Sequence, residues 1–209
     1  MLKAQDPQVH DLDDRGDEGT GRACDTPGDL QHDMARDDIE DLRRRMAQLE
    51  DEREIRYLLG RYGHYVDLGY QDAWVDQWSD HGAYDLVTVK RDGVGYDGAM
   101  RFEGKDQLRS LVQDPAARKL AEGGSLHIQD VNLVVRIDGD DACGHSYSIT
   151  MVRNGKGVQI YSAAMVRWRF QRIEGRWRIA EKIQREVGDG SAFTDAPAIT
   201  AFDAAKPAV

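Results

Sequence analysis

Between residues 126 and 187, polar and apolar side chains alternate in four long segments, at 126–137, 142–153, 157–172 and 176–187. The connections at 138–141, 154–156 and 173–175 are short, and each contains a glycine. Short glycine-containing connections between alternating segments are typical of β-hairpins. We therefore predict four long antiparallel strands joined as a meander.

The residues before the meander have a helical period instead. Over 36–66 the apolar residues recur every three or four positions: Ile39, Leu42, Met46, Leu49, Ile55, Leu58, Leu59, Tyr62 and Val66. A short second helix is predicted over 71–79 and a third over 105–120, with short strands at 83–89 and 100–102. Helices followed by a long antiparallel sheet indicate an α+β protein, in which the helices cover the apolar face of the sheet.

The net charge of −10 is distributed unevenly along the 209 residues. Residues 1–33 contain nine acidic and three basic residues, so they carry −6 of that charge, and they include few apolar residues. Such a composition buries too little surface to offset chain entropy. We expect a disordered acidic tail over 1–33, a folded domain over 34–187 with a charged lead-in helix at 36–54, and a flexible tail over 188–209. Translation could start at Met1 or at Met34.

Composition also excludes several classes of protein. The acidic balance argues against a nucleic-acid binder, because phosphate backbones favour a basic face. No apolar run approaches the roughly 18 residues needed to cross a bilayer, and the acidic start differs from a signal peptide or a mitochondrial presequence. Cys24 and Cys143 form neither a disulfide framework nor a metal-ligand spacing. We expect a soluble, cytoplasmic protein without nucleic-acid or membrane partners.

An ordered set of short motifs spans roughly residues 50–187. It comprises Glu54-Ile55-Arg56, Leu58-Leu59, Arg61-Tyr62, Asp67, Trp78-Ser79-Asp80, His127, Asn132, Ile137-Asp138-Gly139-Asp140, Ala142 and Gly175-Arg176-Trp177-Arg178-Ile179-Ala180-Glu181. In order and spacing this set resembles the SnoaL-like branch of the NTF2-like superfamily. The resemblance implies a cone-shaped α+β barrel, in which a curved antiparallel sheet wraps around N-terminal helices and encloses a deep pocket.

The resemblance also implies candidate catalytic residues. The branch includes scytalone dehydratase, bile-acid 7α-dehydratase, ketosteroid isomerases and polyketide cyclases, together with non-catalytic members. In its dehydratase-like members a pocket histidine and an aspartate form a dyad, often with a tyrosine; the matching positions are His127, Asp67 and Tyr62. Imidazole suits a base that removes a C–H proton near neutral pH, a carboxylate orients it, and a phenol can bind the leaving oxygen.

The position of Asp67 at the end of a predicted helix affects both its charge and the direction of its side chain. It follows the predicted helix and precedes Gly69, where the helix dipole disfavours a negative charge unless a cation such as protonated His127 lies beside it. Asp is also common in solvated turns before glycine. Tyr62 and Asp67 would lie about 140° apart on a straight helix, so both can face a pocket only if the helix ends or bends between them.

A metal site is not expected. A turn at 139–140 pairs His145 with a position near Val134, and His127 then lies over about 20 Å away along the strand. We predict neither a metal nor a cofactor. Either face of segment 142–153 could point inward. A shift of one residue in the turn exchanges Ser146, Ser148 and Thr150 for His145, Tyr147 and Ile149 on the inward face.

We therefore expect a cofactor-independent lyase (dehydratase) or isomerase that acts on a bulky apolar hydroxylated substrate, such as a steroid or polycyclic ketone. Substrate contacts are predicted at Tyr65, Trp78, Val131 and Ile160, and a homo-oligomer, dimer or trimer, is expected. Two alternatives stay open: a non-catalytic protein that binds a hydrophobic ligand, and the structural small subunit of a ring-hydroxylating dioxygenase.

Overall fold

The computed structural model describes residues 27–88, 98–155 and 157–187. The chain divides into two compact units at Arg43–Arg44, and the helix α1 (Pro27–Asp67) runs through both. In the first unit the side chains of Ile39 and Leu42 are exposed. The helix begins seven residues before the end of the segment predicted to be disordered. The remainder of that segment, 1–26, and the predicted C-terminal tail lie outside the described residues.

The second unit contains all the other elements. Along the chain these are α2 (Gln71–Val75), β1 (Trp78–Thr88), β2 (Gly98–Glu103), α3 (Gly104–Gln113), α4 (Pro115–Glu122), β3 (Ser125–Asp138), β4 (Asp141–Asn154), β5 (Gly157–Ile173) and β6 (Arg176–Glu186). The predicted second helix is shorter than expected because Trp78 already begins β1. The helix predicted at 105–120 is split, since Pro115 forces Asp114 out of the helical conformation.

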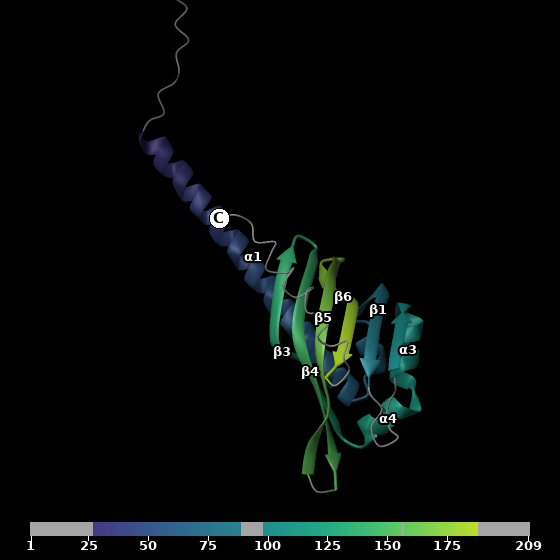
Figure 1. The fold of residues 1–209 in the computed structure, drawn as a ribbon. Helices are drawn as coiled ribbons and strands as arrows, with labels where there is room; N and C mark the ends of the chain where they lie inside the picture. Colours follow the sequence, from purple (N-terminus) through teal and green to yellow (C-terminus); the bar gives the residue numbers. More distant parts are fainter. Residues whose placement is uncertain (1–26, 89–97, 156, 188–209) are drawn as a thin grey trace, which may run out of the picture. The chain divides into compact units, whose positions relative to one another are not determined.

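The strands form one six-stranded sheet in the order β2-β1-β6-β5-β4-β3 (Figure 1). The four-strand meander predicted from the sequence is confirmed, and Val134 pairs with His145 as the turn implied. β1 and β6 are parallel, whereas the other neighbours are antiparallel. The sheet is therefore mixed, with β2 and β3 as the edges of an open cone rather than a closed barrel.

The core lies between α1 and the concave face of this sheet. From α1 it receives Ile55, Leu58, Leu59 and Tyr62; from the strands it receives Val166, Trp168, Phe170, Trp177 and Ile179. Figure 1 shows the C-terminal part of α1 behind β3 to β6, and α3 and α4 at the other end of the sheet. This arrangement confirms the α+β fold class, since the helices cover one face of the sheet.

One β-bulge in β6 and one in β5 reverse the alternation of side chains within those strands. In β6, Ile179 pairs with Phe170 but Glu181 pairs with Arg169, so Ala180 is an extra residue. In β5, Tyr161 is extra in the same way, between partners of Thr150 and Met151. Because a side chain changes face for each inserted residue, the segments beyond each bulge present the opposite set of side chains to the interior.

Gly63 allows α1 to approach the start of β3 closely. A Cβ atom at this position would lie 1.8 Å from the backbone carbonyl oxygen of His127. Gly60, one turn earlier in the same helix, has no atom within 4 Å of such a Cβ. The absence of a side chain at residue 63 therefore sets the separation of helix and strand.

We expect Gly63→Ala to lower the free energy of unfolding by about 1–3 kcal/mol, because the backbone of β3 must move to admit the methyl group. Gly60→Ala is the matched control, and it should raise stability by up to about 1 kcal/mol through helix propensity. Urea unfolding of both variants measures the difference. Equal stabilities for the two variants would contradict the close approach at Gly63.

Candidate active site

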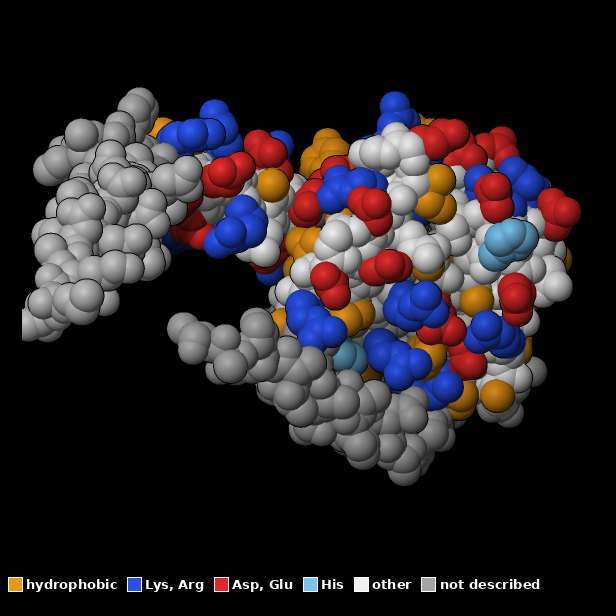
Figure 2. All heavy atoms as spheres, turned by 90° about the horizontal axis from the view of Figure 1, so that it is seen from above, with side chains coloured by type: hydrophobic (Ala, Val, Ile, Leu, Met, Phe, Trp, Pro, Cys, Tyr) orange, Lys and Arg blue, Asp and Glu red, His pale blue; other side chains and the backbone are white. Residues whose placement is uncertain are grey.

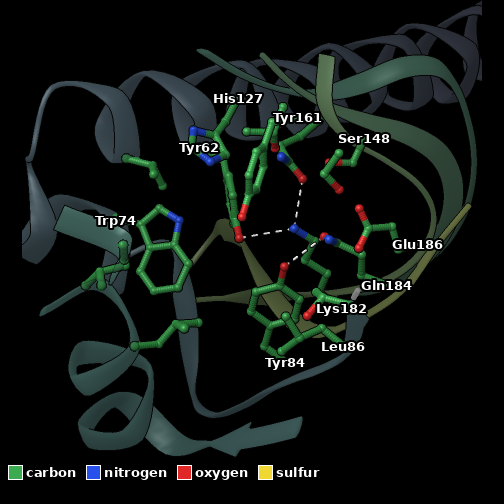
Figure 3. A pocket seen from close by; sticks show the side chains of 18 residues that line it. Tyr62, Trp74, Tyr84, Leu86, His127, Ser148, Tyr161, Lys182, Gln184 and Glu186 are labelled. Atoms are coloured by element: carbon green, nitrogen blue, oxygen red, sulfur yellow. Dashed lines mark hydrogen bonds between the residues drawn. The ribbon is translucent and has the colours of Figure 1, made fainter. Parts of the chain in front are cut away.

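A cavity opens between the end of α1, helices α2 to α4 and the concave face of the sheet (Figure 3). Its volume is about 940 Å³, including the part open to solvent. Apolar side chains form much of its wall: Val66, Trp74, Leu86, Leu111 and Val112. Polar and ionisable side chains from α1, β1, β3, β4, β5 and β6 complete the wall. Such an apolar cavity with a few placed polar groups is typical of a small-molecule site.

Asp67 and His127 are brought together at one side of this cavity. Asp67 is the last residue of α1, and His127 lies near the start of β3. The Asp67 carboxylate accepts a hydrogen bond from the backbone N–H of His127 at 2.9 Å and lies 2.6 Å from its ring Nδ1. Ser125 Oγ lies 3.4 Å from the same carboxylate. These donors stabilise a negative charge where the helix dipole disfavours it.

The pairing determines how His127 faces the cavity. Both side chains are largely buried, with 18% of His127 and 10% of Asp67 exposed. Since a carboxylate accepts hydrogen bonds, Nδ1 of His127 carries a proton, and Nε2 is the nitrogen available to a molecule in the cavity. His127 lines the cavity and Asp67 stands behind it. No bend of α1 is required, because Asp67 faces the start of β3 rather than the cavity.

Tyr62, the third predicted residue, lies in a buried polar network around Lys182 (Figure 3). The Lys182 amine donates to the Tyr62 hydroxyl at 3.2 Å and to the side-chain carbonyl of Gln129 at 2.8 Å. Beside it, the Tyr84 hydroxyl donates to the side chain of Gln184 at 2.7 Å. Four elements, α1, β1, β3 and β6, therefore contribute polar side chains to one region of the cavity wall.

Burial controls the protonation of this network. Desolvation lowers the pKa of the Lys182 amine well below its ordinary value, and it raises the pKa values of Tyr62 and Tyr84. The amine also lies 4.4 to 5.1 Å from the ring centres of Tyr62, Tyr84 and Trp168. A cation–π contact contributes about 0.5–2 kcal/mol, whereas burying an ion costs several kcal/mol. Desolvation favours the neutral amine, and the three aromatic rings act in the opposite direction.

Sequence reasoning missed the polar side chains of β6. Regular alternation from Trp177 and Ile179 would place residue 181 inside and residue 182 outside. The bulge at Ala180 reverses this, and Lys182, Gln184 and Glu186 are instead buried and line the cavity. A sequence signal did exist: the apolar alternation stops after Ile179, and polar residues follow at every second position.

Four side chains predicted to contact the substrate lie outside the described lining of this cavity. Trp78 is fully buried in the core, where it stacks on Tyr84. Tyr65 lines a smaller neighbouring hollow. Ile160 is 65% exposed because the bulge in β5 turns Tyr161 into the cavity in its place. Val131 lies between two register shifts of β3, farther along the strand from His127.

The structure also settles which face of β4 is internal. Ser146, Ser148 and Thr150 are buried, and the last two line the cavity, whereas Tyr147 is 47% exposed. Within the described residues, no three His, Cys, Asp or Glu side chains are grouped so that they could hold a metal ion. No helix in the described part of the chain is long and apolar enough to cross a membrane. On the face shown in Figure 2, acidic and basic side chains are interspersed.

A neutral Lys182 in the folded state predicts a specific dependence of stability on pH. The unfolded chain binds a proton at this amine up to about pH 10.4, so stability rises with pH above the lowered native pKa, by up to about 1.4 kcal/mol per unit. Lys182→Met should lack this rise, and its stability relative to wild type should fall as the pH is raised toward about 10.4. Urea unfolding at several pH values measures it.

Lys105→Met removes a partly exposed lysine, paired with Asp80, and is the control for the loss of charge. This variant should follow the wild-type pH dependence. A constant difference in stability between wild type and Lys182→Met across the same pH range would show that Lys182 is charged in the folded protein.

Comparisons with known proteins identify the fold. The chain is 26% identical to an NTF2-like protein with a cystatin-like fold from Novosphingobium aromaticivorans, with 76% of this chain and 96% of that chain covered and a TM-score of 0.66. A protein of unknown function from Mycobacterium tuberculosis is 24% identical, with 69% and 78% covered and a TM-score of 0.55. The β subunit assigned to an aromatic-ring-hydroxylating dioxygenase of Novosphingobium aromaticivorans is 22% identical, with 68% and 91% covered and a TM-score of 0.53.

A search of curated proteins by sequence found no match. The family model for the SnoaL-like domain matches residues 47–182, which include α1 from its middle, the sheet as far as Lys182 in β6, and both residues of the Asp67–His127 pair. The chain therefore belongs to the SnoaL-like family, within the NTF2-like superfamily.

Proposed function

We propose that this protein is a cofactor-independent lyase or isomerase that works by acid–base chemistry in the cavity. The observation that carries the proposal is the Asp67–His127 pair at 2.6 Å, with His127 in the cavity wall. A carboxylate that holds imidazole in one tautomer and stabilises its protonated form is the arrangement that a general base requires. His127 is the proposed base, and Asp67 is the proposed orienting group.

Tyr62 is the proposed donor to the leaving or enolising oxygen. Its hydroxyl oxygen accepts a hydrogen bond from Lys182, so its own proton can be donated to a substrate oxygen. In a dehydration, Nε2 of His127 would remove a C–H proton, and the hydroxyl group would leave as water with a proton from Tyr62. In an isomerisation, the same two groups would move a proton between carbons through an enol.

The composition of the cavity wall favours a bulky, mostly apolar substrate with one or two oxygen substituents. Val66, Leu86, Leu111 and Val112 offer apolar contacts, and the polar side chains are confined to particular positions. Hydroxysteroids and polycyclic ketones have this distribution of polar and apolar surface. We expect the protein to act as a homo-oligomer, a dimer or a trimer, and sedimentation analysis measures this.

A second candidate is supported by the likeness to the β subunit of a ring-hydroxylating dioxygenase. In that case the chain would assemble with a separate iron-bearing subunit and its cavity would have no catalytic role. Affinity purification of the full chain from its native host discriminates the two, because a stoichiometric iron protein would be present only in the second case.

We expect His127→Ala to lower turnover by about 10² or more without unfolding the protein. The measurement is incubation with a panel of hydroxysteroids and polycyclic ketones, followed by mass spectrometry for the loss of one water and by absorbance for a new conjugated product. Asp67→Asn should lower turnover as well, since the amide cannot stabilise the imidazolium.

The control is His64→Ala, which removes an exposed histidine of α1 and should keep wild-type turnover. Wild-type turnover in His127→Ala would rule out its role as the base. Binding of panel members without any product, in wild type and variants alike, would instead identify a non-catalytic ligand-binding protein.

A further inference from the structure

Lys182 is a buried ionisable group that the proposed acid–base chemistry does not use directly. Its side chain is 1% exposed, yet it belongs to the wall of the cavity. Burial lowers the pKa of the amine. The titratable groups that share the cavity wall with it are Tyr62, Tyr84, His127, Tyr161 and Glu186.

The two hydrogen bonds of Lys182 are within the capacity of a neutral amine. A neutral amine has two hydrogens and one lone pair. The amine donates twice within the described residues, to Gln129 and to Tyr62. These two bonds use both hydrogens and leave the lone pair for another atom. Figure 3 shows the amine between Tyr62 and Tyr84, on the cavity side of β6. A desolvated lysine with an available lone pair is a nucleophile.

We propose that Lys182 captures the carbonyl group of an aldehyde or ketone ligand in the cavity as an imine. The nitrogen lone pair forms a bond to the carbonyl carbon, and the C=O π pair moves to the oxygen. Tyr62 gives its proton to that oxygen and takes one from the nitrogen. The carbinolamine then loses water: the nitrogen lone pair forms the C=N bond, the hydroxyl group leaves with a proton from Tyr62, and the remaining proton on the nitrogen returns to Tyr62. No oxidation or reduction occurs.

Tyr62 is suited to this proton relay because it already touches the amine. Its hydroxyl lies 3.2 Å from Nζ, so a carbonyl oxygen attached to the attacked carbon would lie within its reach. Burial keeps the phenol protonated, since the pKa of Tyr62 is raised. The capture involves no atom of Asp67 or His127, so it stands apart from their proposed role.

Reductive trapping tests the proposal. The full-length protein is incubated with 2-naphthaldehyde and sodium cyanoborohydride near neutral pH, and the hydride converts any imine to a stable secondary amine. Intact mass and peptide mapping should then show one predominant adduct, on Lys182. Its labelling should exceed that of Lys105 by about tenfold or more, because each unit of lowered pKa raises the neutral fraction tenfold.

Four variants and a pH series make the test specific. Lys105→Met should keep the adduct, and Lys182→Met should lose it. Tyr62→Phe should slow trapping while the label stays on Lys182, which covers the case in which Lys182→Met fails to fold. Lowering the pH should reduce labelling of the exposed lysines more than that of Lys182. Asp67→Asn should be labelled as wild type is, even if it loses turnover.

The proposal is overturned if the label spreads over the exposed lysines with no preference for Lys182. It is equally overturned if the aldehyde quenches the tryptophan fluorescence of the cavity, and so binds, but no adduct forms at residue 182. In that event Lys182 is a structural group held by its aromatic neighbours.

Discussion

The contact between the end of α1 and the start of β3 positions the whole site. Gly63 lets the two backbones meet, and four residues later the Asp67 carboxylate bonds both the backbone N–H and the ring of His127. The carboxylate lies at a helix C-terminus, where the dipole opposes its charge, so its stability there depends on those donors. Strand position, imidazole tautomer and the available Nε2 atom all depend on this single contact.

The polar side chains of β5 and β6 face the cavity because these two strands are irregular. One extra residue in β6 and one in β5 exchange the inward and outward faces of the strand ends. Apolar side chains thus form the core at one end of the sheet, and Lys182, Gln184 and Glu186 face the cavity at the other. Without the bulges the same residues would be solvated, and the cavity would lack its amine.

The sequence carries enough information to predict most of the fold. Period-two alternation and glycine-containing turns give the four meander strands to within one or two residues, because that pattern is local. The nearness of Asp67 and His127 followed from the family resemblance rather than from any local pattern. Bulges leave a weak sequence signal, so Lys182 was missed and Ile160 was assigned in place of Tyr161. Trp78 was misplaced because an aromatic residue suits a core and a pocket equally well.

Asp67 holds His127 with Nδ1 protonated and Nε2 directed to the cavity, and the proposed function depends on this tautomer. NMR of the protein labelled with ¹⁵N-histidine observes the tautomer directly. We expect a proton on Nδ1 of His127, hydrogen-bonded to Asp67, and an unprotonated Nε2 in the neutral ring. A neutral ring protonated on Nε2 would contradict this assignment, because Nδ1 would then accept a hydrogen bond from a protonated Asp67 and no base would face the cavity.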